Sequence, residues 1–166
     1  MLLRSDLQSV YGPEPKLGGP VATPLLVALG ISAGLELLAK YWSGKARTTQ
    51  ADVRSFLIDV GRLAKPDAEA LVQFRNAVAH GYGLATRRVK DEQPFMFAVD
   101  TDTVTPVAVI KQTAADEYVV YLWPLKRFFL QCIAGCRRAI SKDWQRMLGF
   151  VVCIRNLREI RVSKAA

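Results

Sequence analysis

The chain has 166 residues, of which 51% are hydrophobic and 23% are charged, and its formal net charge is +8. This composition excludes a disordered chain and fits one folded domain over residues 1–166. The first residues lack a basic segment followed by an apolar run, so we expect no secretory signal and a cytoplasmic protein.

The first predicted element is a long helix over residues 24–42. The stretch 21–35 carries no charge, but it is shorter than the roughly 20 residues that cross a bilayer. Pro24, Gly30 and Gly34 interrupt it, and Glu36 and Lys40 follow on the same helix. The pattern therefore predicts a buried bundle helix, and no membrane partner.

Two further helices follow. Thr49 is a suitable N-cap for a helix through residues 51–63, which has a stripe of apolar side chains. Pro66 and Asp67 favour the start of a third helix, which should run to about Ala79 and stop at Gly81. The first half of the chain thus predicts a helical bundle.

Residues 94–122 change character, because β-branched and aromatic residues gather in short runs. Runs at 95–99, 107–110 and 118–122 predict two or three strands, with a turn over residues 100–103. We therefore expect a mainly α fold with a small antiparallel β insert.

Residues 123–166 form a basic C-terminal part with ten basic and two acidic side chains, whereas residues 1–122 contain thirteen of each. Pro124 opens an amphipathic helix, and we favour a further helix over 144–162. The basic excess suits the phosphate backbone of RNA, and the candidate contacts are Arg127, Arg137, Arg138 and Arg146. A solvated helical face is the alternative interpretation.

The three cysteines, Cys132, Cys136 and Cys153, occur in a chain with a single histidine and no CxxC pair. This set gives little support to a zinc site, so we expect buried reduced thiols and no metal. No nucleotide-binding glycine loop and no HExxH motif is present, and we expect no cofactor.

The segment that carries chemistry is Arg75-Asn76-x-x-x-His80-Gly81. Asn76 and His80 are four apart and share a helix face, and the long side chain of Arg75 can reach the same region. His80 would lie in the last helical turn, where unpaired carbonyls favour a protonated imidazole. A guanidinium, an amide and a titratable imidazole together suit the handling of phosphate.

This segment resembles the signature of the HEPN (higher eukaryotes and prokaryotes nucleotide-binding) family, an arginine followed by a polar residue and then a histidine. The earlier stretch from Gly34 to Lys40 is similar to the first core helix of that family. The resemblance covers two helices and implies a HEPN-like helical bundle. It also implies metal-independent RNA cleavage, with Arg75, Asn76 and His80 as the catalytic residues.

The resemblance further implies a homodimer, because HEPN proteins are similar in pairing across this helix region. His80 is the chain's single histidine, so a second imidazole would have to come from a second copy. Members of the family act as toxins or defence nucleases, and a neutralising antitoxin such as a nucleotidyltransferase is an implied partner.

Two alternatives stay open. In the first, a HEPN-like dimer binds a nucleotide, RNA or a protein without cleaving anything. In the second, the chain is a helical interaction protein, the motif is coincidental, and His80 only caps a helix end.

Overall fold

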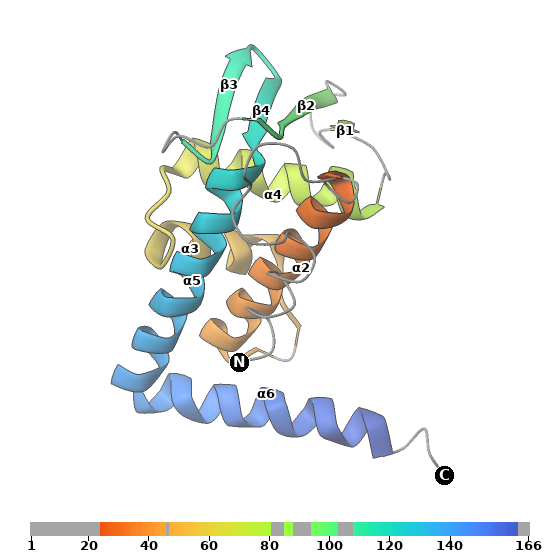
Figure 1. The fold of residues 1–166 in the computed structure, drawn as a ribbon. Helices are drawn as coiled ribbons and strands as arrows, with labels where there is room; N and C mark the ends of the chain where they lie inside the picture. The colour runs from red at the N-terminus through yellow and green to blue at the C-terminus, as the bar shows by residue number, and fades with distance from the viewer. Residues whose placement is uncertain (1–23, 46, 81–84, 88–93, 103–107, 163–166) are drawn as a thin grey trace.

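The computed structural model describes residues 24–45, 47–80, 85–87, 94–102 and 108–162, apart from the side chains of His80, Thr86, Arg87, Pro94 and residues 155–162. The described part is mainly α-helical (Figure 1), as the sequence predicts. Its helices are α2 (Pro24–Ser43), α3 (Gln50–Asp59), α4 (Lys65–His80), α5 (Leu122–Lys142) and α6 (Trp144–Val162).

Helix α2 is the centre of the bundle, since it packs against α3, α4, α5 and α6. Ala28, Ile31 and Ala39 on this helix have no exposed surface. Among the described helices, α2 is long and apolar enough to cross a membrane. In its most apolar 18 residues, 44% is buried inside the protein. Its Gly34 lies so close to the ring of Phe129 that an added Cβ would be 2.6 Å from it, which explains a small residue there.

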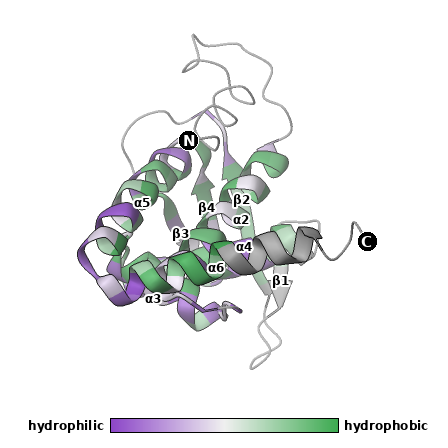
Figure 2. Cartoon of the chain, turned by 90° about the horizontal axis from the view of Figure 1, so that it is seen from below, coloured by the Kyte–Doolittle hydropathy of each residue, from purple (hydrophilic) through white to green (hydrophobic). Residues whose placement is uncertain are grey.

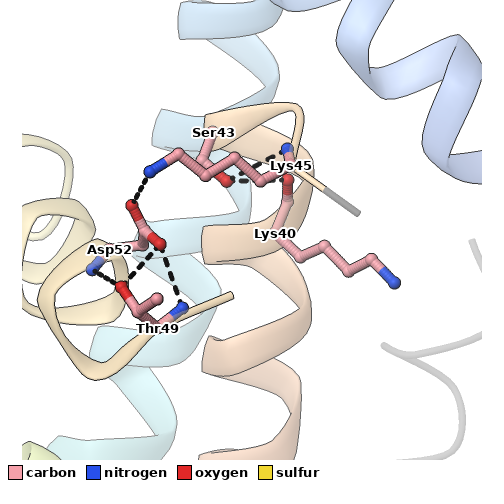
Figure 3. Close-up of polar contacts among 5 residues, drawn as sticks. All are labelled: Lys40, Ser43, Lys45, Thr49 and Asp52. Carbon is pink, nitrogen blue, oxygen red and sulfur yellow. Dashed lines mark hydrogen bonds and ion pairs between the residues drawn. The ribbon is translucent and has the colours of Figure 1, made fainter. Parts of the chain in front are cut away.

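The start of α3 is fixed by a capping box, shown in Figure 3. The amide of Asp52 donates to the hydroxyl oxygen of Thr49 (3.2 Å), and the amide of Thr49 donates to the carboxylate of Asp52 (2.9 Å). The ammonium of Lys45, just after α2, also binds this carboxylate. Hydrogen bonds from Lys45 and Thr49 lower the pKa of Asp52 from 3.8 to about 2. These contacts join the end of α2 to the start of α3.

Helix α3 ends at Asp59, four residues earlier than predicted. Arg62 has a positive φ of 61°, which a continuing α-helix does not allow. A Cβ at Gly61 would lie 2.6 Å from the Phe128 ring, so the chain turns where α5 comes close.

The described strands form one sheet in the order β1-β2-β4-β3 (Figure 1). They are β1 (Ala85–Arg87), β2 (Pro94–Asp100), β3 (Ile110–Ala114) and β4 (Glu117–Tyr121). The prediction of an antiparallel insert is wrong for the central pair, because β2 and β4 are parallel. Strand β3 lies at the edge of the sheet, and β4 lies between β3 and β2. Because the β3–β4 hairpin reverses the chain, β4 runs in the same direction as β2.

The sheet covers α4 through aromatic side chains. Phe95 and Phe97 of β2 are buried, and the Phe97 ring meets that of Phe74 on α4 edge to face at 5.4 Å. The strand expected at 107–110 instead begins at Ile110, and β1 was not predicted. The expected turn lies partly outside the described residues; within it, the amide of Asp102 donates to the carboxylate of Asp100 at 2.9 Å.

Helices α5 and α6 agree with the predicted helices of the C-terminal part. Helix α6 crosses the end of the bundle that is opposite the sheet (Figure 1). Seen from that end, α6 lies across the face of the molecule and is hydrophobic over its first half (Figure 2).

Candidate functional site

Helix α4 carries the predicted motif and is held between the bundle and the sheet. Its core face consists of small and large apolar residues, including the fully buried Phe74 and the nearly buried Ala77. Arg75 and Asn76 stand beside this face and are half-buried. The motif residues therefore lie at the border between the core and the solvent.

The Arg75 side chain joins α4 to α2. Its Nη2 forms an ion pair with the carboxylate of Glu36, and its Nη1 donates to the side-chain oxygen of Asn76 at 3.0 Å. The side chains of Arg75 and Glu36 are 25% and 35% exposed. Two partners from two directions hold the planar guanidinium in one orientation, as a fork of fixed donors allows.

The side chains of Arg75 and Asn76 thus contact one another. His80 is the last residue of α4, so its backbone stands one helical turn beyond Asn76 on the same face. The imidazole of His80 lies outside the described side chains. For the predicted site, the structure therefore describes the side chains of Arg75 and Asn76 and the backbone of His80.

Glu36 was not predicted as a site residue. It is the single acidic residue of α2, which otherwise has only Lys40 as a charged group. An isolated carboxylate on an apolar core helix costs free energy unless a cation meets it. That isolation is the sequence signal that points to a buried or half-buried cationic partner such as Arg75.

A second ion pair between an arginine and a glutamate lies at the other half of α4. Arg54 of α3 binds Glu69, and the two side chains are 31% and 34% exposed. This pair has burial similar to that of Arg75 and Glu36, but it joins different helices and lies away from the motif. It offers a matched structural control.

The four arginines predicted to contact RNA differ in their surroundings. Arg137 and Arg138 are exposed near the end of α5, and Arg127 is half-buried. Arg146 on α6 lies 4.4 Å above the ring of Trp42 and donates to that residue's carbonyl at 3.4 Å. It also donates to Asp143 at 3.1 Å, so its observed contacts fasten α6 to α2.

The cysteines are free and buried, as predicted. Burial raises the pKa of Cys132 to about 12, with a further contribution from Cys136, and raises the pKa of Cys136 to about 11. Thiols with such pKa values are protonated at neutral pH and are poor nucleophiles. Within the described ranges, no group of three or more His, Cys, Asp or Glu residues could hold a metal ion.

No protein-family model, no curated protein and no solved structure gives a significant match to this chain. The likeness to the HEPN family therefore depends on the motif residues themselves and on their setting in the helices.

Proposed function

We propose that the chain is a HEPN-type endoribonuclease that cleaves RNA without a metal ion and works as a homodimer. The observation that carries this proposal is the arrangement of Arg75, Asn76 and Glu36. The guanidinium of Arg75 is held by Glu36 and by Asn76 at the motif position where the HEPN resemblance implies contact with phosphate. A toxin or defence nuclease is the role that such an activity suits.

In the proposed reaction, the ribose 2′-oxygen attacks the neighbouring phosphorus and the bond from phosphorus to the 5′-oxygen breaks. One imidazole removes the proton of the 2′-hydroxyl, and a second, protonated imidazole gives a proton to the leaving 5′-oxygen. Arg75 stabilises the negative charge that develops on the phosphate oxygens. Asn76 orients Arg75 through its side-chain oxygen, and Glu36 is a positioning residue behind it.

A dimer is part of this proposal because the chain has one histidine. A twofold axis beside the end of α4 would place two copies of His80 and Arg75 in one cleft. Exposed Arg137 and Arg138 would extend the contact to RNA phosphates outside the cleft. A separate antitoxin would neutralise the enzyme by covering the cleft.

The proposal is tested by incubating purified protein with mixed RNA in EDTA. Wild-type protein should cleave, His80→Ala should lose on the order of 10²–10⁴-fold in rate, and Arg75→Ala should lose on the order of 10²–10³-fold. Arg54→Ala is the matched control, because it breaks an ion pair of similar burial on the same helix. It should retain the wild-type rate under conditions where the protein stays folded.

Binding of labelled RNA is measured in parallel. If wild-type protein binds RNA but leaves it intact, the chain is a binding dimer and the nuclease proposal is wrong. If Arg54→Ala loses as much activity as Arg75→Ala, then Arg75 supports activity by stabilising the fold and does not act on the phosphate.

A further inference from the structure

Over residues 144–154, helix α6 has two apolar faces, and one of them packs against other described parts of the chain. The packed face meets the end of α2: the rings of Phe150 and Tyr41 are in edge contact at 5.1 Å, and Cys153 is buried. Gly149 lies against the backbone of Gly44, where an added Cβ would be 2.7 Å from its Cα. The helix is therefore held close to α2 over its first ten residues.

The other face of α6 is exposed and apolar. It consists of residues at the spacing of one helical stripe, and they are 44–64% exposed: Trp144, Met147, Leu148, Val151 and Val152. Among the described residues, the other large exposed apolar side chains are Leu25, Leu26 and Met96, which lie elsewhere. Figure 2 shows this hydrophobic half of α6 lying across the end of the molecule.

The size of this stripe fits the apolar centre of a protein interface. Aromatic side chains such as Trp144 have on the order of 150–250 Å² of surface and the aliphatic ones have less, so five side chains that are about half exposed offer roughly 400 Å². A standard interface covers about 800 Å² on each partner, with an apolar centre and a polar rim. The stripe supplies about half of that area, and the polar residues beside it would supply the rim.

The shape of the stripe favours a second copy of the same helix. Its bulky residue, Trp144, is at one end, and the small residues Val151 and Val152 are at the other. In an antiparallel pair, the indole of each copy lies opposite the valines of the other, and Leu148 of both copies lies near the axis. Such a contact is self-complementary, as a twofold interface must be.

We propose that α6 pairs, antiparallel and about a twofold axis, with α6 of a second copy of this chain. This contact is separate from the proposed RNA cleft, because α6 lies at the end of the bundle opposite the sheet and the end of α4 (Figure 1). Cleft pairing and α6 pairing together would link cleft dimers to one another through their α6 helices.

Basic side chains beside the stripe predict how the salt concentration affects α6 pairing. Arg137, Arg138 and Lys142 are exposed near the end of α5, which leads directly into α6. Two copies of this region repel one another, and salt screens this repulsion, so α6 pairing should strengthen as the salt concentration rises. Binding to an anionic membrane or to an acidic protein would weaken under the same change.

The experiment compares the molar mass in solution of wild-type protein, Val151→Asp and Gln131→Asp, at equal concentration and at low and high salt. Val151→Asp should lower the mass to that of the cleft dimer, or to that of the monomer if the cleft dimer does not form, because it would bury a carboxylate in the α6 pair. The control Gln131→Asp, on the exposed side of α5, should keep the wild-type mass. A fall in mass is therefore expected with or without the cleft dimer. Cleavage by Val151→Asp should stay at the wild-type rate.

A second variant tests the same contact without placing a charge in it, in case Val151→Asp fails to fold. Leu148→Cys should form a disulfide-linked pair under mild oxidation, while Gln131→Cys should not. Equal masses for wild-type protein and Val151→Asp, with no cross-link at position 148, would overturn the proposal. Sedimentation of wild-type protein with vesicles of anionic phospholipid, through the same stripe and without any change in mass, would overturn it in favour of a membrane.

Discussion

At the scale of the residue, the site depends on how Arg75 is held. A free arginine side chain has many rotamers, and fixing it on substrate costs conformational entropy. Glu36 on α2 and Asn76, the next residue on α4, hold the guanidinium before substrate binds. Because the ion pair is half-buried, its electrostatic attraction is less screened than that of a pair on the open surface.

This arrangement predicts that Glu36 and Arg75 act as one unit in catalysis. Glu36→Ala should lower kcat about tenfold, because the guanidinium loses its orientation, and should leave KM nearly unchanged. In the background of Arg75→Ala, the same Glu36→Ala change should have almost no further effect on kcat. The measurement is a double-mutant cycle on the cleavage rate.

The control cycle uses Arg54 and Glu69, whose single substitutions should change thermal stability but not kcat. Additive losses of kcat for Glu36→Ala and Arg75→Ala would show that the carboxylate does not act through this arginine.

The residue scale also shows what the sequence could predict. Arg75 and Asn76 were predicted because their segment resembles the HEPN signature, and helical geometry placed Asn76 on the same face as His80, four residues later. Glu36 was missed because its partner is 39 positions away, and no local rule joins them. Arg146 illustrates the opposite case: it belongs to the basic C-terminal part, yet its observed partners are Trp42 and Asp143 of the same chain.

At the scale of the element, the helices were easier to predict than the strands. Helices α2, α4 and α6 agree closely with their predicted ranges, because capping residues and apolar periodicity are local signals. Within helix α6, residues 150–154 have a composition that is typical of strands. Its two apolar faces explain this pattern: one packs on α2, and the other is exposed.

The direction of the strands was beyond local reasoning. The hairpin of β3 and β4 follows from neighbouring residues, but the pairing of β2 with β4 depends on which edge β3 occupies. That choice is tertiary, because it is made by packing of the sheet on α4 through residues such as Phe97 and Phe74.

The close contact between α2 and α6 gives a prediction about stability. Gly149→Ala would place a Cβ 2.7 Å from the Cα of Gly44, and backbone cannot yield as a flexible side chain can. We expect a loss on the order of 1–3 kcal/mol in the free energy of unfolding, measured by chemical denaturation.

The matched control is Gly30→Ala on α2, where an added Cβ meets no atom within 4 Å. Alanine has the higher helix propensity, so this variant should gain up to about 1 kcal/mol. If both alanine variants were equally stable, the helices would not be in the close contact described.

At the scale of the whole molecule, the chain offers two ends with different chemistry. One end carries the sheet and the end of α4 with the motif, and the other carries α6 with its exposed apolar stripe (Figure 1). Mainly α architecture and the position of the sheet between α4 and α5 were predicted from the sequence. The proposed pairing of copies at either end depends on surfaces that only the folded chain brings together.

The measurement that tests the central proposal most directly mixes active and inactive copies. Wild-type protein and His80→Ala are unfolded together, refolded to allow free pairing, and assayed for RNA cleavage in EDTA at a constant total concentration. If the cleft needs His80 from both copies, activity follows the square of the wild-type fraction and an equal mixture retains about one quarter of it. A linear fall, to about one half, would mean that each copy cleaves by itself and would contradict the composite site.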